Sequence, residues 1–437
     1  MGQVYAGDRA RGRRMIFVDL ALILLLVVVL VFFRSEMAKA WLSLSSLSLI
    51  MVGNIILLVY RAWASYDAYH SIDGPVGSGA GASLAGLALV ALIVAPHAAL
   101  GYLNVSQYSF ISDVFAPAAT TTTTPSSVGP TTPGGPTTTT PQDPTIWDGL
   151  DRLNIVLLGS DRSGSRTDAV TLVDTVILVS IDPQTGNAAM VSLPRNMTQF
   201  PLPEGMGYWD CNCFPQLLND LYQRAVERPE AFPGSGEPGP RAMKAAVGHL
   251  LGVDVHYYAM INMDGFVGLV DALGGVDMYV PQTIVDEEYP HEDGSIVSIR
   301  IEAGQQRLDG HHALAYARIR RHADDFARMN RQRCVVGAVV EQSSPLEIVA
   351  RYGAITEVLR TNLVTDIPRE RLPDFIDLLP KVSMDRVGAL LVDMSYSVGA
   401  HEVRGTLYDT DRIRLEAQAL LADPTAGGPV TLEAACD

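Results

Sequence analysis

One stretch of the chain, residues 316–332, gathers arginines and aspartates in a protein whose net charge is −16. These residues are Arg318, Arg320, Arg321, Asp324, Asp325, Arg328 and Arg331. Arg318 and Arg320 are two residues apart, so an extended segment would point both side chains in the same direction. Converging guanidinium groups suit a ligand with several anionic oxygens, because each planar fork can bond two of them.

The second half of this stretch has helical spacing. Asp325, Arg328 and Gln332 are spaced to share one face of a helix. Two interpretations are open at this point. The arginines either bind an anionic ligand, or they pair with Asp324 and Asp325 on a solvated helix.

Further polar residues stand at the ends of predicted strands. Asp161 follows the apolar run Leu153–Gly159, and Asp174 opens the next one. Arg195 follows Pro194, which would end a third strand. Ligands of open α/β sheets bind at strand ends, so these side chains and the arginine-rich stretch could share one cleft. The alternatives are a turn or cap carboxylate for Asp161 and a surface salt bridge for Arg195.

Two aspartates with several arginines fit phosphoryl transfer. Mg²⁺ prefers oxygen ligands and is commonly held by one or two carboxylates together with water and substrate phosphate. The arginines would bind the remaining phosphoryl oxygens, and such chemistry depends mainly on positioning and charge neutralisation. The sequence contains no G-x-S-x-G, no H-E-x-x-H and no P-loop lysine. We therefore expect Mg²⁺ as the cofactor.

The periodicity of the second half predicts an α/β fold with one central sheet flanked by helices. Predicted strands are 153–159, 174–181, 188–193, 255–262, 276–280 and 387–392. Predicted helices are 214–226, 241–251, 264–273, 334–340, 346–359 and 411–421. His311 and His312 are expected in the exposed first turn of a further helix.

The N-terminal part predicts three transmembrane helices. The apolar runs are Met15–Phe33, Trp41–Tyr60 and Ser83–Leu103, close to the ~20 residues needed to span a bilayer. The basic tail, residues 1–14, places the N-terminus in the cytoplasm. Three crossings would then place everything after Leu103 outside the cell membrane.

A Thr- and Pro-rich linker and one globular domain complete the predicted organisation. The Thr- and Pro-rich stretch Ala116–Pro144 cannot bury enough apolar area to fold and is interpreted as an extracellular spacer. The predicted organisation is a membrane region over 15–103, a linker over 104–146 and an extracellular domain over 147–437. The acidic balance argues against a nucleic-acid partner, which would need a basic face.

The four cysteines match no zinc pattern. Cys211 and Cys213 are too close in sequence to bridge each other easily. A disulfide in an extracellular domain would therefore join one of them to Cys334 or Cys436.

The order of motifs resembles the LytR-CpsA-Psr family. The segments that carry the resemblance are NIVLLGSD (154–161), VDTVILVSIDPQTGNAAMVSLPRN (173–196), LLGVDVHYYAMINMDGFVGLVDALGGVDMYVP (250–281) and RLDGHHALAYARIRRHADDFARMNRQ (307–332). Together they cover a core of residues 151–332, and the last two are specific. The membrane anchor and the C-terminal portion resemble the larger actinobacterial members.

The resemblance implies an enzyme that transfers a glycopolymer from an undecaprenyl-pyrophosphate carrier to peptidoglycan, with a magnesium-pyrophosphate site and an apolar pocket for the polyprenyl tail. Carried over by motif, Asp161 and Asp174 would be the metal ligands. Arg195, Arg318, Arg320, Arg328, Arg331 and Gln332 would bind the pyrophosphate. Asp325 would orient an arginine or accept the proton of the attacking hydroxyl.

Two residues depart from the family pattern. Leu172 stands where members usually have Arg, and Asn196 stands where many have Asp. The upstream Arg166-Thr167-Asp168 could supply the missing charge, or Asp168 could replace Asp174 as ligand; the position of Asp174 relative to the Asp182-Pro183 turn favours Asp174. Two other functions stay open, a polyprenyl-pyrophosphate pyrophosphatase and a non-catalytic protein that binds polyprenyl lipid or the wall.

Overall fold

The computed structural model divides the chain into two compact units. It describes residues 9–70, 80–115, 150–162, 170–291, 294–319, 325–342, 351–378, 381–382, 386–400 and 405–425. One unit comprises Met1–Asp113 with Arg369–Asp377, and the other comprises Val114–Pro368 with Leu378–Asp437. The segment 369–377, predicted as part of the globular domain, thus groups with the N-terminal helices.

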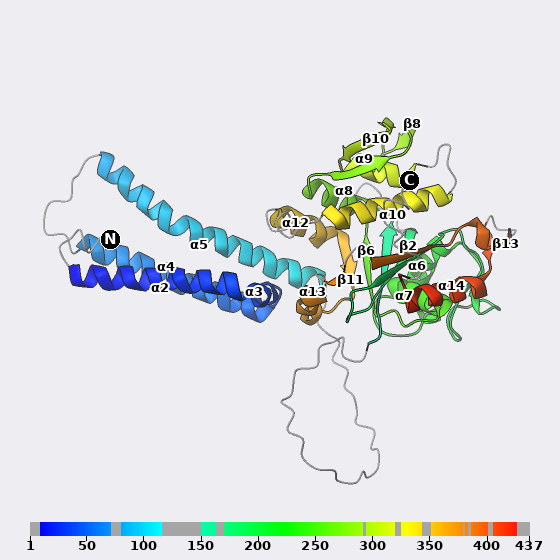
Figure 1. The fold of residues 1–437 in the computed structure, drawn as a ribbon, viewed down its shortest axis with the longest axis horizontal. Coiled ribbons are helices and arrows are strands. Elements are labelled where there is room, and N and C mark those ends of the chain that lie inside the picture. Colours follow the sequence, from blue (N-terminus) through cyan, green and yellow to red (C-terminus); the bar gives the residue numbers. More distant parts are fainter. Residues whose placement is uncertain are drawn as a thin grey trace, which may run out of the picture. The chain divides into compact units, whose positions relative to one another are not determined.

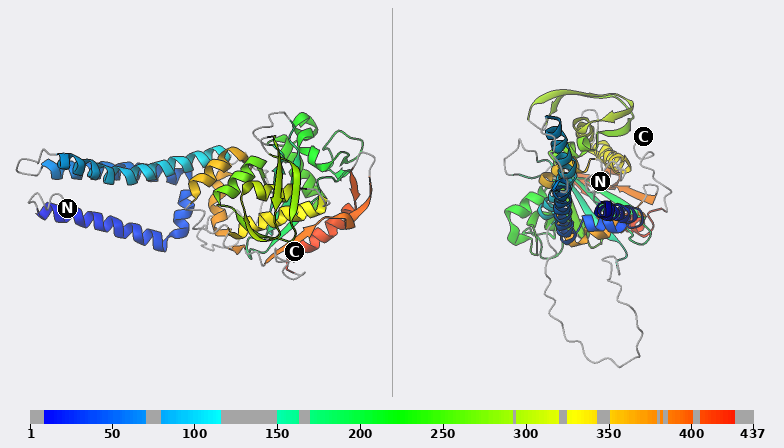
Figure 2. Two further views of the ribbon diagram at one scale, coloured as in Figure 1. Left: turned by 90° about the horizontal axis from the view of Figure 1, so that it is seen from above. Right: turned by 90° about the vertical axis from the view of Figure 1, so that its left-hand side faces the viewer.

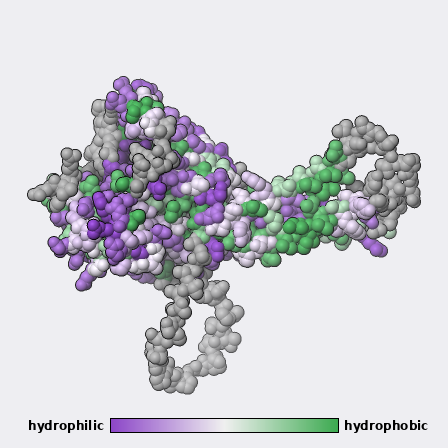
Figure 3. Space-filling view, turned by 180° about the vertical axis from the view of Figure 1, so that it is seen from behind, coloured by the Kyte–Doolittle hydropathy of each residue, from purple (hydrophilic) through white to green (hydrophobic). Residues whose placement is uncertain are grey.

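Long apolar helices make up most of the first unit. They are α2 (Arg9–Phe32), α4 (Leu44–His70) and α5 (Ala80–Val114); the short and more polar α3 (Arg34–Trp41) lies between α2 and α4 in the chain, and the segment 369–377 adds η3 (Arg369–Arg371) and most of α13 (Leu372–Leu378). Within the described residues, α4 and α5 are long and apolar enough to cross a membrane, over Leu44–Asp67 and Leu87–Val114. Apolar side chains cover much of their surface (Figure 3).

The three predicted spans are helical over most of their length, but three membrane crossings stay a prediction, because among the described residues two helices meet the criterion of length and composition. The third helix also continues past Leu103 to Val114, so the first part of the predicted linker 104–146 is helical. The remaining part of the predicted linker, 116–146, lies outside the described residues.

Polar side chains join α4 and α5, which lie side by side (Figure 2). Asn54 Nδ2 donates to the backbone oxygen of His97 at 2.9 Å, and His97 Nδ1 lies 2.6 Å from Asn54 Oδ1. Further along, Asn104 Nδ2 donates to the Leu47 oxygen at 3.0 Å. Without a hydrophobic force between helices in lipid, such bonds and close packing hold helices together. The pair therefore has a defined register.

A six-stranded mixed sheet forms the centre of the second unit, in the order β11-β6-β1-β2-β3-β12. Its strands are β1 (Leu153–Ser160), β2 (Val173–Ile181), β3 (Ala188–Leu193), β6 (Tyr257–Ile261), β11 (Leu363–Thr365) and β12 (Val387–Leu391). β1 is antiparallel to β2 and parallel to β6. The predicted α/β fold with a central sheet flanked by helices is confirmed.

Helices cover both faces of this sheet (Figure 1). One layer contains α6 (Leu221–Glu227), α7 (Pro238–Leu251) and α14 (Thr410–Ala422); the other contains α8 (Met263–Ala272), α9 (Gly310–Arg318), α10 (Asp325–Gln342) and α12 (Tyr352–Asn362). Val156, Leu158, Val176 and Leu178 pack with α7 in the main core. Leu157 and Ile177 alternate with them and so point to the other layer.

Short strands that were not predicted surround the sheet. They are β4 (Phe200–Pro201), β5 (Cys213–Phe214), β8 (Ile284–Pro290), β9 (Ile296–Ile301), β10 (Gly304–Leu308), β13 (Ser397–Ala400) and β14 (Thr406–Tyr408). β10 pairs with the predicted β7 (Val276–Val280). The predicted helix 214–226 begins only at Leu221, because Phe214 pairs with Phe200 and Pro215 follows it.

The prediction for the cysteines was wrong. Cys211 and Cys213 form a disulfide with each other. An extended segment would hold their Cα atoms about 7 Å apart, but the chain bends at residues 211–212 and brings them to 5.0 Å, within the usual range for disulfides. Cys334 is also disulfide-bonded, and Cys436 lies outside the described residues.

Gly310 allows α9 to approach α8, because a Cβ at this position would overlap the backbone carbonyl of Val267. We expect Gly310→Ala to push the helices apart and to lower the free energy of unfolding by about 1–3 kcal/mol. Gly353 in α12 is the matched control, since a Cβ there meets nothing within 4 Å. Gly353→Ala should raise the stability by about 0.5–1 kcal/mol. Urea titration of the full chain in detergent, followed by circular dichroism, measures both; equal stabilities would contradict the close approach.

Candidate active site

A cavity of about 340 Å³ lies between the sheet and the layer formed by α8, α9, α10 and α12. Most of its wall is apolar, with side chains such as Leu157, Ile177, Ile261, Phe266, Val335 and Leu363. Its polar lining includes Asp161, Asp174, Arg318, Arg328 and Gln332. These five residues belong to the predicted site, so folding brings them to one place although they are far apart in sequence.

The edge where β1 ends and β2 begins supplies the two aspartates. The register shifts between Gly159 and Ser160, and a Cβ on Gly159 would lie only 3.0 Å from the Thr175 side chain. Glycine therefore lets the Thr175 side chain pack closely at this bulge. Beyond it, Asp161 Oδ1 accepts from the Leu172 amide at 2.9 Å, which fixes the carboxylate beside the start of β2. Asp161 therefore bonds to the backbone, as expected of a turn carboxylate, and it also lines the cavity.

Asp174 lies at the centre of a charged network. Arg195 Nη1 lies 2.6 Å from Asp174 Oδ2, and Asn219 Nδ2 donates to Asp174 Oδ1 at 3.2 Å. Arg328 Nη1 donates to the backbone oxygen of Asp174 at 3.4 Å. Burial alone would raise the pKa of Asp174, but Arg195 outweighs it with help from Asn219 and Arg328, so the pKa lies below its ordinary value of 3.8. Asp174 is thus ionised at neutral pH.

The segment between Arg195 and Asn219 is closed at its base by backbone hydrogen bonds. Asn219 N donates to Arg195 O at 3.1 Å, and Leu218 N donates to Met197 O at 2.9 Å. Arg195 and Asn219, which both contact the Asp174 carboxylate, therefore lie at the two ends of one loop whose ends are held together. Asn219 was not among the predicted site residues, because a single asparagine before a helix carries no signal that it contacts a distant aspartate.

Arg328 is the most buried of the arginines that the structure describes, with only 2% of its surface exposed. It lies in the first turns of α10, whose helical nature was predicted from the spacing of Asp325, Arg328 and Gln332. A buried guanidinium requires nearby negative charge or hydrogen-bond acceptors. Asp174 supplies part of this requirement, through its backbone oxygen and the charge of its carboxylate.

Arg318 is the last residue of α9 and so is not part of an extended segment, while its pairing with Arg320 stays a prediction because Arg320 lies outside the described residues. The apolar face of α9, which includes Leu314 and Ala317, keeps the segment helical up to this point. Arg318 Nη1 donates to the Tyr289 hydroxyl at 3.1 Å, and its guanidinium carbon lies 5.6 Å from the centre of that ring. Tyr289, on β8, was not predicted.

Arg331 holds the end of α9. Its Nε donates to Tyr316 O at 2.7 Å, and its Nη2 donates to Ile319 O. These bonds fix the backbone next to Arg318, while a role of Arg331 in binding substrate stays a prediction. Arg320, Asp324 and Asp168 lie outside the described residues, as does the side chain of Asp325.

The donor set at the cavity fits a hard cation. Asp161 and Asp174 line the same cavity and offer carboxylate oxygens, as Mg²⁺ prefers. Among the described residues no group of three or more His, Cys, Asp and Glu side chains is placed to hold a metal. A two-carboxylate site completed by water and a phosphate is therefore the arrangement compatible with these residues.

The LytR_cpsA_psr family model matches residues 123–418, more than half of the chain. The chain belongs to the LytR_cpsA_psr family. A polyisoprenyl-teichoic acid–peptidoglycan teichoic acid transferase, TagU, from Oceanobacillus iheyensis is 30% identical over 224 residues, which are 51% of this chain and 61% of that protein. TagU from Bacillus subtilis is 24% identical over 259 residues, 59% of this chain and 69% of that protein.

Solved structures of similar chains include B. subtilis TagV, with a TM-score of 0.47 and 20% identity over 62% of this chain and 98% of that one. TagT bound to LIIa-WTA gives a TM-score of 0.45 and 21% identity over 64% of this chain and 96% of that one. The match to the first of the curated relatives spans about three fifths of its length.

The two departures from the family pattern have local explanations. Leu172 contacts Asp161 through its backbone, since the two residues exchange N–H···O bonds. Asn196 lies within 3.4–3.5 Å of Thr406 Oγ1 and the Tyr408 hydroxyl on β14. A charged carboxylate is not required for these contacts.

The lowered pKa of Asp174 predicts a pH dependence with a definite sign. Its ion pair stabilises the fold fully above the ordinary carboxyl pKa of 3.8, and this contribution is lost as the pH falls through the lower pKa of the folded state. The difference in unfolding free energy between wild type and Asp174→Asn should be constant between about pH 5 and 7 and shrink below about pH 4. Chemical denaturation at several pH values measures it. A difference that grows toward acid pH would contradict the ion pair.

The contact between Tyr289 and Arg318 predicts a positioning effect. Tyr289→Phe keeps the ring and removes the hydroxyl, so binding of inorganic pyrophosphate should weaken about 2- to 10-fold, the usual range for one hydrogen bond. Tyr279→Phe on β7 is the control, because Tyr279 is 52% exposed. Isothermal titration of the full-length protein measures both. Equal binding by the two variants would show that the hydroxyl does not position Arg318.

Proposed function

We propose that this protein is a membrane-anchored, Mg²⁺-dependent phosphotransferase that attaches a glycopolymer from an undecaprenyl-pyrophosphate carrier to peptidoglycan. The observation that carries the proposal is one cavity that combines a long apolar wall with Asp161, Asp174, Arg318 and Arg328. A polyprenyl pyrophosphate has the same two parts, an apolar tail and a polyanionic head. Family membership and the names of the TagU relatives support this choice.

The residues of the cavity can be assigned to parts of the reaction. Arg318 and Arg328 would bond the oxygens of the pyrophosphate, because guanidinium groups bind phosphoryl oxygens in pairs. Arg195 orients Asp174, and Asp161 with Asp174 would hold the Mg²⁺. When bound, Mg²⁺ would neutralise charge on the pyrophosphate.

The transfer itself breaks one phosphorus–oxygen bond and forms another. A hydroxyl oxygen of the peptidoglycan acceptor attacks the sugar-linked phosphorus and loses its proton, for which Asp325 is the proposed acceptor. The bond to the bridging oxygen breaks, and that oxygen leaves with the electron pair as polyprenyl monophosphate. The arginines favour this step because negative charge accumulates on the oxygens they contact.

The proposed location matches the two substrates. Three crossings by α2, α4 and α5 would leave the N-terminus in the cytoplasm and the catalytic unit outside. A lipid-linked donor in the membrane and a wall acceptor would both be accessible there. Nucleic acid is not an expected partner, because the net charge of −16 disfavours it.

The test uses the full chain in lipid nanodiscs with a polyprenyl-pyrophosphate-linked oligosaccharide, peptidoglycan fragments and Mg²⁺, with the products identified by mass spectrometry. Wild type should form a sugar–phosphate–peptidoglycan adduct, and Arg318→Ala should form it at least about 100-fold more slowly, as for loss of a transition-state contact. Arg300→Ala on β9 is the matched control, because Arg300 is exposed and pairs with Glu302. Chelation should also abolish the adduct.

Other products would identify the alternatives. Monophosphate products without an adduct, under conditions where the acceptor is present in excess, would indicate a pyrophosphatase. Bound but unchanged donor would indicate a protein that binds polyprenyl lipid without catalysis. Equal rates for Arg318→Ala and Arg300→Ala would contradict the assigned site.

A further inference from the structure

A second and larger groove, of about 920 Å³, lies on the opposite side of the sheet from the active-site cavity. Tyr258 and Ala259 are neighbours on β6; Tyr258 lines the groove, and Ala259 lines the cavity. Successive side chains of a strand point to opposite faces. The two sites are therefore separated by the sheet, and a ligand of one cannot be in contact with residues at the floor of the other.

Small residues on the outward side of α7 form the bottom of the groove. Ala245, Gly248 and Gly252 follow each other at helical spacing and line it. A Cβ on Gly248 would lie 2.6 Å from the Val253 backbone oxygen, so glycine lets the turn after α7 pack closely against the helix. Gly252 ends the helix with a φ of 69°. The hollow is thus built into the helix and the turn that follows it.

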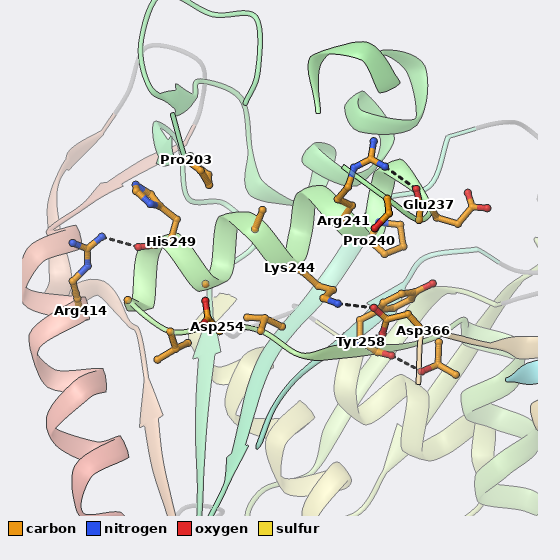
Figure 4. A pocket seen from close by; sticks show the side chains of 18 residues that line it. Pro203, Glu237, Pro240, Arg241, Lys244, His249, Asp254, Tyr258, Asp366 and Arg414 are labelled. Atoms are coloured by element: carbon orange, nitrogen blue, oxygen red, sulfur yellow. Dashed lines mark hydrogen bonds and ion pairs between the residues drawn. The ribbon is translucent and has the colours of Figure 1, made fainter. Parts of the chain in front are cut away.

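The basic side chains that line the groove already have partners (Figure 4). Lys244 Nζ lies 2.5 Å from Asp366 Oδ2. Arg241 donates to two loop carbonyls, and Arg414 donates to the Leu250 and His249 oxygens at the end of α7. The lining contains three basic residues, Arg241, Lys244 and Arg414, and three acidic ones, Glu237, Asp254 and Asp366.

This balance selects among ligand classes. A polyanion requires excess positive charge, and a lipid tail requires a mainly apolar wall; the groove offers neither. An extended peptide binds to an exposed strand edge or to apolar anchor pockets. Of the strands, only β6, which is an inner strand, and Thr365 at the end of β11 contribute to the lining.

A neutral, hydroxyl-rich ligand can form hydrogen bonds with both the acidic and the basic side chains of this lining. Each hydroxyl can donate to a carboxylate and accept from an ammonium or guanidinium group. Burial, with the nearby Asp366 carboxylate, raises the pKa of Tyr258, so its hydroxyl stays protonated. The C–H faces of sugar rings can pack against Ala245 and Pro240 at the bottom.

We propose that this groove is a second binding site for a neutral saccharide chain, remote from the reacting pyrophosphate. The proposal rests on the proposed function, because that function makes wall glycan the polymer the protein encounters. The site would retain a glycan while the active site acts on one end of a chain. Both the acceptor strand and the transferred polymer are sources of such saccharide.

Ala245→Trp is designed to fill the groove. The matched control is Val226→Trp on α6, because Val226 is 46% exposed and does not line the groove. Full-length protein in nanodiscs is titrated calorimetrically with chitotetraose, which represents the amino-sugar strand, and with maltotetraose, which represents a neutral hexose polymer. Wild type and Val226→Trp should bind at least one of them, and Ala245→Trp should bind at least tenfold more weakly.

The choice of probe identifies the source. Preference for chitotetraose assigns the groove to the acceptor strand, and preference for maltotetraose assigns it to the transferred polymer. Affinity should be the same at 0.05 and 0.5 M salt, since a neutral ligand is not screened. If Ala245→Trp does not fold, His249→Ala replaces it, because His249 is exposed and lines the groove.

Three results would overturn the proposal: no binding of either saccharide by wild type, equal binding by the groove variants and Val226→Trp, or binding of an uncharged peptide in place of the saccharides. Transfer to a short soluble acceptor, measured in parallel, should be unchanged in Ala245→Trp. If the wild-type protein performs no transfer but binds saccharide, and Ala245→Trp loses that binding, the saccharide site would be supported and the proposed function would be rejected.

Discussion

The pairing of Asp174 with three polar partners is the interaction on which the active site depends. A carboxylate and two guanidinium groups beside an apolar cavity are unfavourable unless they neutralise one another. Arg195, Asn219 and Arg328 come from a loop end, a short helical turn and α10, so no single element could produce the arrangement. The same pairing that makes the charges compatible with burial also holds Arg328 in the position where a phosphoryl group could reach it.

The sheet separates two environments by the alternation of its side chains. On β1 and β2, the residues that pack with α7 alternate with those that face the cavity, so one short segment serves both a closed core and a ligand site. The same alternation on β6 places Ala259 in the cavity and Tyr258 in the polar groove. A largely apolar cavity on one face and a more polar groove on the other are thus consequences of a strand period of two.

Much of the architecture could be predicted from the sequence, since long apolar runs such as 174–181 and 188–193 have few alternatives to a buried strand. Asp161, Asp174, Arg318, Arg328 and Gln332 were found because motif order relates them before any contact is known. Asn219 and Tyr289 could not be found, because their roles arise only from packing between distant segments. The Cys211–Cys213 disulfide was missed for a local reason, a bend that residue spacing does not reveal.

The arginine-rich stretch is held in place on both sides of the segment that carries Arg320. On the N-terminal side, Arg331 donates to the Tyr316 and Ile319 oxygens, and Tyr289 contacts Arg318. On the C-terminal side, α10 begins at Asp325 and its buried Arg328 contacts β2. Sites that stabilise developing charge act best when their groups need no rearrangement during the reaction. Arg331 therefore contributes to the site through the backbone that it holds, whether or not it touches substrate.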